Sequence, residues 1–229
     1  MHGSDIVVKE VKNLGSSYMS LTLFLKNIFD VVVGVFLLLL IIPILVFIAV
    51  VIKLDSSGPV FFKQQRVGIK GKPFSIYKFR TMIVNAVNIG AGLNIVDNDP
   101  RITAVGKILR DWSLDELPQI INIVKGEMSF IGPRPTLQYQ VDNYTDHQRK
   151  RLNMKPGVTG WAQINGRNNI SWEERIELDV WYVDNWSLWL DMKIVLKTPT
   201  VVLNKDNVYS NTGVSYDFKG TESDKNKLH

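Results

Sequence analysis

Hydrophobic and polar positions divide the chain into a long apolar segment and a mixed region that follows it. Residues 31–52 contain no charged side chain, and as a helix this run is long enough to cross a hydrocarbon layer of about 30 Å. The polar residues 1–20 do not form a cleavable signal, because their charges are mixed and the apolar run lacks a small-residue cleavage site. We therefore expect a flexible lead-in over 1–20 and a membrane helix over 21–53.

Two membrane topologies are possible for this helix. Pro43 lies in the middle of the apolar run, where it removes a backbone hydrogen bond and favours a kink. Lys26 precedes the run and Lys53 follows it, so positive charge hardly distinguishes its two ends. A straight span and a helix that bends at Pro43 and leaves on the same face both fit, and the residues alone favour the straight span.

The pattern after residue 53 predicts a mainly helical α+β domain over 54–204. Two aromatic runs, 60–62 and 74–79, flank a polar stretch with two glycines and predict a small β-hairpin. Helices are expected over 102–112, over 136–153 and from 171 to beyond 182, and amphipathic segments with Trp186 and Trp189 are typical of the membrane–water interface or of a core. The polar residues 205–229 are expected to form a mobile tail.

Composition narrows the classes of function. Lys and Arg number 27 and Asp and Glu 22, for a net charge of +5, a mild excess that suits phosphate-bearing substrates or anionic lipid headgroups. The basic residues are dispersed, which disfavours nucleic-acid binding. The absence of cysteine excludes disulfides and thiolate metal sites.

An acidic pair is the first candidate for chemistry. Ser113 and Glu116 fit a capping box, so residues 113–116 are expected to open a helix. Neighbours on a helix point about 100° apart, so Asp115 and Glu116 are expected to have different roles. Ordinary helix capping is the alternative interpretation, since acidic residues are common in a first turn.

Cationic and amide side chains supply candidate binding groups. Two prolines flank Arg134 in 130–135, a rigid turn suited either to bidentate phosphate capture or to a simple connector. The second predicted strand delivers Lys78 and Arg80, either to a ligand or to solvent. The glycine-rich loop 155–168 suits a sugar, a diphosphate or a nucleobase edge, and it has neither P-loop nor dinucleotide spacing. Its polar side chains include Gln163, Asn165 and Arg167.

Five motifs in order resemble the bacterial sugar transferases of the monotopic polyprenyl-phosphate phosphoglycosyl transferase family. The likeness extends from about Lys26 to Leu203 and corresponds to the minimal members with one hydrophobic segment. The matching segments are 78–82, 113–119, 126–135, 155–160 and 163–168.

The resemblance implies a re-entrant membrane helix broken at Pro43, in place of the straight span. Family members often have serine before this proline, whereas this chain has Ile42. The implied location is the bacterial inner membrane, with the catalytic domain on the cytosolic face and its amphipathic helices in contact with lipid.

The resemblance also implies a reaction. A sugar 1-phosphate passes from a nucleotide sugar, usually a UDP-sugar, to polyprenyl (undecaprenyl) phosphate, UMP is released, and a glycoconjugate pathway such as capsule or exopolysaccharide synthesis begins. By analogy Asp115 forms a covalent aspartyl-phosphosugar intermediate, and Glu116 shares Mg²⁺ binding with Asp115 or steers the leaving group. Asp179 is implied to be a further functional carboxylate, either a base or an orienting group. The cations expected to offset phosphate charge are Lys78, Arg80, Arg110, Arg134, Arg151 and Arg167.

Two other functions fit the same features. A membrane-bound glycosyltransferase would move the bare sugar and release UDP, and a membrane-tethered scaffold would catalyse nothing. The sugar, the pathway and the oligomeric state, for which a homodimer is one option, stay open at this point.

Overall fold

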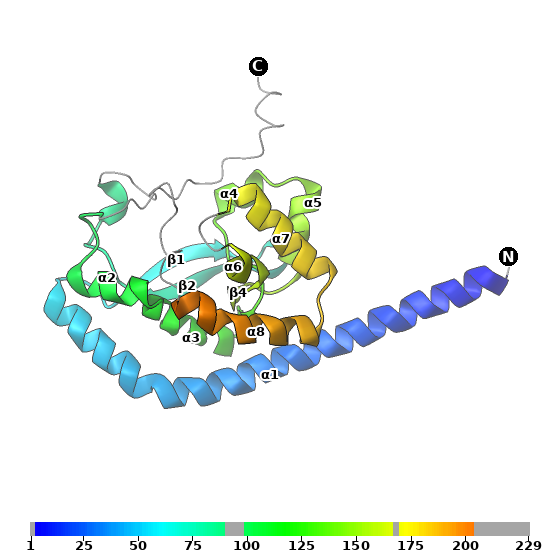
Figure 1. Cartoon of the computed structure of the whole chain (residues 1–229), viewed down its shortest axis with the longest axis horizontal. Coiled ribbons are helices and arrows are strands. Elements are labelled where there is room, and N and C mark those ends of the chain that lie inside the picture. The colour runs from blue at the N-terminus through cyan, green and yellow to red at the C-terminus, as the bar shows by residue number, and fades with distance from the viewer. Residues whose placement is uncertain (1–2, 90–98, 167–169, 204–229) are drawn as a thin grey trace, which may run out of the picture.

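A long N-terminal helix runs beneath a smaller domain of short helices and two-stranded sheets (Figure 1). This computed structural model describes residues 3–89, 99–166 and 170–203. Within these residues the β-structure is an antiparallel hairpin and a short parallel pair, and most other elements are helical. The mainly helical α+β class with a small hairpin is thereby confirmed, whereas the expected tail, 205–229, lies outside the described residues.

Helix α1 (Gly3–Asp55) contains most of the expected lead-in, the whole apolar run and Pro43. The helix continues through Pro43, so the expected break is not confirmed. Figure 1 shows a bend instead, in the light-blue part of α1, and the helix follows the underside of the domain while its dark-blue N-terminal part projects beyond it. A proline inside the helix is a common cause of such a bend.

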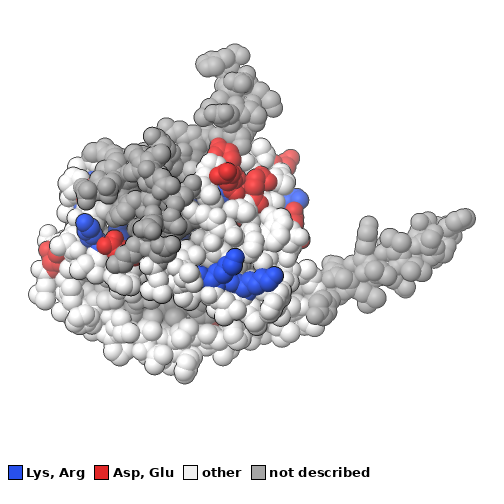
Figure 2. Space-filling model, viewed as in Figure 1, with Lys and Arg blue, Asp and Glu red and all other residues white. Residues whose placement is uncertain are grey.

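The outer face of α1 is apolar and exposed. Among the described residues, α1 is the one helix long and apolar enough to cross a membrane, over Met19–Asp55, and 11% of its most apolar stretch is buried. A helix in a protein core would be mostly buried by other parts of the protein. The exposed apolar face of α1 therefore suits contact with an apolar environment outside the domain. On the face shown in Figure 2, no charged side chain lies along the lower rim. Exposed apolar residues include Phe24, Phe29, Phe36, Leu40 and Phe47 on α1, and Trp189, Val195 and Leu196 on α8 (Leu188–Leu203).

The inner face of α1 packs against the domain. Ile48 and Ile52 are buried beside Phe79. Gly34 brings α1 close to α3 (Ile120–Val124), because a Cβ at this glycine would lie 3.2 Å from Cγ2 of Ile123. Helix α1 is therefore packed against the core of the domain and forms one of its sides.

A buried charged cluster also joins α1 to α8. The ammonium group of Lys26 lies 3.0 Å from Oδ2 of Asp191 and 3.7 Å from Oδ2 of Asp30. Tyr182 donates to Oδ1 of Asp191 over 2.6 Å, and Nε1 of Trp186 donates to Oδ2 over 3.2 Å. All five residues are buried, so these charges depend on one another for compensation. Trp186 is consequently a core residue and not an interfacial one.

The expected hairpin is formed by β1 (Phe61–Val67) and β2 (Pro73–Phe79), with η1 (Ile69–Gly71) in the connection. Phe74 and Ile76 pack on the buried Ile123. Lys78, two residues further along β2, lies on the same face because strand side chains alternate. The strand therefore directs this lysine toward the segment that precedes α3.

A second, parallel pair joins β3 (Ser129–Ile131) to β4 (Gly157–Thr159), which the sequence pattern did not predict. Two glycines permit the close approach. A Cβ on Gly132 would lie 2.2 Å from the carbonyl oxygen of Lys155, and a Cβ on Gly157 would lie 2.1 Å from the nitrogen of Gly132. Any side chain at either position would separate the two backbones.

The capping boxes expected from sequence have different outcomes. Ser113 adopts φ 55°, in the left-handed region, and makes no side-chain capping bond, so this box is wrong. The 3₁₀ helix η3 (Leu114–Gln119) follows it directly and frees the Glu116 side chain for tertiary contacts. Ser171 and Glu174 do form the box that opens α7 (Trp172–Asp184). The remaining elements are η2 (Ala86–Asn88), α2 (Ala104–Asp111), α4 (Gln138–Asp142), α5 (Asp146–Arg149), η4 (Lys150–Asn153) and α6 (Trp161–Asn165).

Candidate active site

A cavity of about 1020 Å³ lies between the hairpin, η3 and helices α1, α7 and α8. Charged side chains gather around Glu116 of η3, which we call the polar end, and the apolar lining residues include Leu37 and Ile41 of α1 with Val201 and Val202 of α8. The site residues expected from sequence that line it are Lys78, Arg80, Arg110, Asp115, Glu116, Arg134 and Gln163.

Glu116 is the centre of an ion-pair network at the polar end. Its Oε1 lies 2.6 Å from the ammonium nitrogen of Lys78 on β2 and 2.8 Å from Nη2 of Arg134. Burial alone would raise the pKa of the Glu116 carboxyl, but the charges of Arg134 and Lys78 outweigh burial and hold this pKa well below its ordinary value. Three motifs that are distant in sequence therefore meet at one carboxylate.

Asp115 has a different environment. A 3₁₀ turn places successive side chains about 120° apart, so Asp115 does not share the Glu116 contacts. Its carboxylate is half-buried on the cavity wall, and within the described residues it forms no ion pair or hydrogen bond. Burial and the neighbouring Glu116 charge raise the pKa of Asp115, while Lys78 and Arg110 oppose the rise. The Asp115 carboxylate therefore borders the cavity, whereas that of Glu116 is held in place by two cations.

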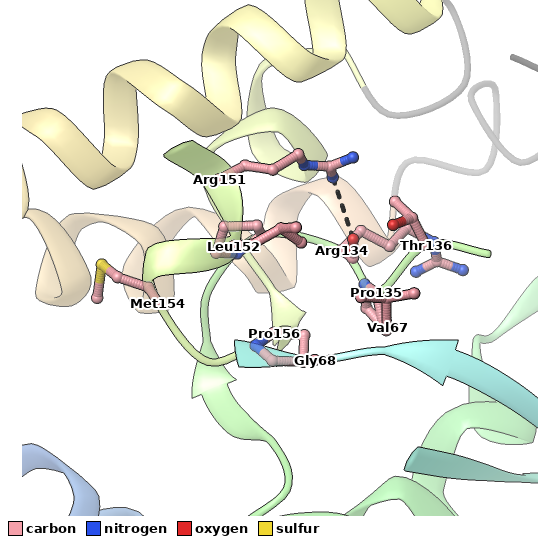
Figure 3. Close-up of a pocket in the computed structure, with 10 residues that line it drawn as sticks. Val67, Gly68, Arg134, Pro135, Thr136, Arg151, Leu152, Met154 and Pro156 are labelled. Atoms are coloured by element: carbon pink, nitrogen blue, oxygen red, sulfur yellow. Dashed lines mark hydrogen bonds between the residues drawn. The ribbon is translucent and has the colours of Figure 1, made fainter. Parts of the chain in front are cut away.

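The side chain of Arg151 holds the backbone of Arg134 in place. Nη2 of Arg151 donates to the Arg134 carbonyl oxygen over 3.1 Å (Figure 3). The same guanidinium forms a buried ion pair with Asp179 and a hydrogen bond with the Tyr144 hydroxyl. The void of about 10 Å³ beside this contact has room for one water at most.

Arg151 and Asp179 are therefore not on the wall of the large cavity. Their side chains are each 1% exposed, and they contact the phosphate-binding candidate Arg134 only through its backbone. Burial raises the pKa of the Asp179 carboxyl, and this effect outweighs the opposing effect of the Arg151 charge. Within the described residues Arg151, a substrate-binding candidate, and Asp179, expected to be a base or an orienting group, pair with each other behind Arg134, and their roles stay predictions.

Two further arginines are held by different groups. Nε of Arg110 donates to Oγ1 of Thr81 over 2.8 Å, which directs this guanidinium along the cavity wall. The Arg80 guanidinium instead donates to the carbonyl oxygens of Ser56, Ser57 and Pro59, at 2.8, 2.8 and 2.6 Å. Arg80 thus stabilises the chain where α1 ends, although it also borders the cavity.

The amide-rich loop contributes one residue to the cavity. Both amide atoms of Gln163 are buried and find no hydrogen-bond partner in the described part of the chain. An unpaired buried amide costs free energy, so a ligand with adjacent donor and acceptor groups suits this position. Asn165 is exposed, does not line the cavity and donates to the Trp161 carbonyl. Arg167 lies outside the described residues.

Sequence reasoning missed Arg175 and Trp172, which line the cavity from α7. The Arg175 guanidinium lies 4.6 Å from the centroid of the Trp172 ring. The signal available in the sequence was spacing, because Arg175 lies one turn before Asp179 on the same helical face.

The donors present fit a magnesium ion only together with a ligand. In the described residues no cluster of three or more His, Cys, Asp or Glu side chains has metal-binding geometry. Magnesium is commonly held by one or two carboxylates and substrate phosphates. Asp115 has an available carboxylate, whereas Oε1 of Glu116 is already shared by two cations.

Comparison with known proteins agrees with the motifs. The bacterial sugar transferase family model matches residues 21–205. An uncharacterized sugar transferase of Bacillus subtilis, EpsL, is 47% identical over 193 residues, which are 84% of this chain and 94% of that protein.

Two longer relatives carry more specific names. The undecaprenyl-phosphate galactose phosphotransferase of Salmonella typhimurium is 41% identical over 81% of this chain and 42% of its own length. The UDP-glucose:undecaprenyl-phosphate glucose-1-phosphate transferase of Escherichia coli is 45% identical over 76% of this chain and 39% of its own length. With the family match extending from α1 to the end of α8, this chain belongs to the bacterial sugar transferase family and is a transferase enzyme.

Proposed function

We propose that this enzyme transfers a sugar 1-phosphate from a UDP-sugar to polyprenyl phosphate and releases UMP. The environment of Asp115 is the observation that supports this function most strongly. Asp115 faces the cavity without an ion pair in the described residues, next to a carboxylate that Lys78 and Arg134 hold fast. The names of the Salmonella and Escherichia relatives support the same class of substrates.

The first step is attack by an Asp115 carboxylate oxygen on the phosphorus that carries the sugar. A bond forms between this oxygen and phosphorus, the bridging bond of the diphosphate breaks, and UMP leaves with the bonding electrons. In the second step a phosphate oxygen of the polyprenyl phosphate attacks the same phosphorus. The aspartyl bond breaks, Asp115 is restored, and polyprenyl diphosphosugar is the product.

The neighbouring cations lower the cost of placing a carboxylate beside a diphosphate. Lys78, Arg110 and Arg134 line the same cavity as Asp115 and stabilise negative charge that develops on the phosphoryl oxygens. Mg²⁺, held by Asp115 and to a lesser degree by Glu116, would supply further charge compensation when bound with the donor. Glu116 orients Lys78 and Arg134, because both cations lie within 3 Å of its Oε1.

The membrane supplies the second substrate. The exposed apolar faces of α1 and α8 suit the hydrocarbon region of a bilayer, and both helices contribute apolar walls to the cavity. A prenyl chain beside Leu37, Ile41, Val201 and Val202 would place its phosphate toward the polar end. We propose that α1 enters and leaves the cytosolic leaflet of the inner membrane on one face, with its bend in the bilayer.

Analysis of products and adducts tests this function. The full chain is incubated with a panel of UDP-sugars, with polyprenyl phosphate present or absent. We expect UMP release and a phosphosugar mass on Asp115. D115N would form no adduct and release no UMP, whereas D142N, a change at an exposed carboxylate of α4, would behave like the natural chain.

The rival functions give other products. Release of UDP would favour transfer of the bare sugar, and absence of both nucleotides with every donor would favour a scaffold. Normal turnover in D115N would exclude Asp115 as the nucleophile. In each outcome, the thermal unfolding of D115N must match that of D142N, so that loss of activity is not loss of fold.

A further inference from the structure

Cationic side chains outnumber carboxylates among the described residues that line the cavity. Among the described residues, six cationic side chains and two acidic ones line it. Two of the cations, Lys78 and Arg134, share Glu116. Helix α7 contributes one of the six cations, Arg175, which lines the cavity together with Trp172.

The guanidinium of Arg175 is orientated by its surroundings. It lies 4.6 Å from the Trp172 ring centroid, a stacking distance that restricts its plane. Asp179, the carboxylate one turn further along α7, is already paired with Arg151.

Charge around this residue is unfavourable for a cation. Burial lowers the pKa of Arg175, the charges of Arg134 and Arg151 lower it further against the opposing effect of Asp179, and the value falls to about 10. A cation placed among cations is stabilised when an anion binds between them, and guanidinium groups bind phosphate in a planar, bidentate manner.

We infer that Arg175, orientated by Trp172, forms with Arg134 a phosphate-binding subsite on the α7 wall of the cavity. The inference rests on the proposed function for the identity of its ligand, which is either the diphosphate of the donor or the phosphate of the prenyl acceptor. Both present the same phosphoryl oxygens, and separate half-reactions distinguish them.

Binding of inorganic diphosphate tests the subsite without turnover. Calorimetric titration of the full chain in detergent compares the natural chain with R175Q, R175K and R149Q, the last a change at an exposed arginine of α5. Loss of one charge-assisted hydrogen bond is expected to weaken binding about tenfold in R175Q. We expect R175K to lose less diphosphate affinity than R175Q, and R149Q to keep the affinity of the natural chain. The affinity of R175Q should also depend less on salt concentration.

Equal affinity in R175Q and the natural chain would overturn the subsite, as would a natural chain that does not bind inorganic diphosphate. Slower single-turnover UMP release in R175Q without acceptor would assign the subsite to the donor. A defect confined to transfer from the preloaded protein to polyprenyl phosphate would assign it to the acceptor. Diphosphate binding that depends on Arg175 in a protein without any covalent adduct would retain the subsite and reject the proposed function.

Discussion

Lys26 of the apolar helix and Asp191 of α8 form a buried ion pair with 3.0 Å between Nζ and Oδ2. The two residues are far apart in sequence, and their side chains are 7% and 8% exposed. The pair therefore joins α1, the long apolar helix, to α8 inside the domain, where each charge compensates the other.

Removing one partner of this pair is expected to destabilise the whole domain. K26M would leave Asp191 and Asp30 buried without their cation, which typically costs about 3–5 kcal/mol. Thermal unfolding followed by tryptophan fluorescence should show a marked fall in melting temperature, whereas K193M, at an exposed lysine of α8, should have little effect. Equal stability of the two variants would mean that the ion pair contributes nothing.

Glu116 is expected to act through the cations it holds. In E116Q the amide keeps the shape of the side chain but loses the charge that pairs with Lys78 and Arg134, so both cations lose their fixed positions. We expect UMP release to fall by about two to three orders of magnitude. Unlike D115N, this variant should still accumulate the phosphosugar adduct slowly, as intact mass spectrometry can measure. A complete absence of adduct would give Glu116 a direct part in the first bond change.

Asp179 is expected to be a positioning residue and not a general base. D179N removes the charge that compensates the buried Arg151, which loosens the backbone of Arg134. The variant should raise the KM for the donor more than it lowers kcat, and its pH–rate profile should keep the natural shape. Loss of the acidic limb of that profile in D179N would instead identify this carboxylate as a base.

The ion pairs of Glu116 also predict how stability depends on pH. The pKa of this carboxyl is lower in the folded protein than its ordinary value of 4.5, so the unfolded chain binds a proton first as the pH falls. The pairs therefore stabilise the fold above that value, and their contribution declines as the pH decreases toward the folded pKa. Urea unfolding between about pH 6 and about pH 3 should show this loss, and E116Q should lose less stability over the same interval.

The sequence predicted the parts of the site that lie within single motifs. Lys78, the Asp115–Glu116 pair and Arg134 each belong to a short pattern, and the structure brings all of them to one cavity. The hairpin was predictable because two short aromatic runs lie on either side of a polar stretch that contains two glycines.

Contacts between distant elements were not predictable in this way. Nothing local shows that Arg80 donates to the carbonyl groups where α1 ends, whereas Arg110 donates to Thr81, although both line the cavity. Ser113 matched a capping box, yet its left-handed backbone starts a 3₁₀ turn. That Arg175 lines the same cavity as Arg134 depends on how α7 packs on the domain, and helical periodicity gives only the face that is buried.

The apolar walls of the cavity have a practical consequence for work with the purified enzyme. Leu37, Ile41, Val201 and Val202 offer a hydrocarbon environment that does not distinguish a prenyl chain from the alkyl tail of a detergent. Micelles used for extraction therefore bring their own competitor to the place where the carrier lipid would lie. Kinetics measured in nanodiscs should show a lower KM for the carrier than kinetics measured in micelles, and the difference should grow with the length of the detergent tail.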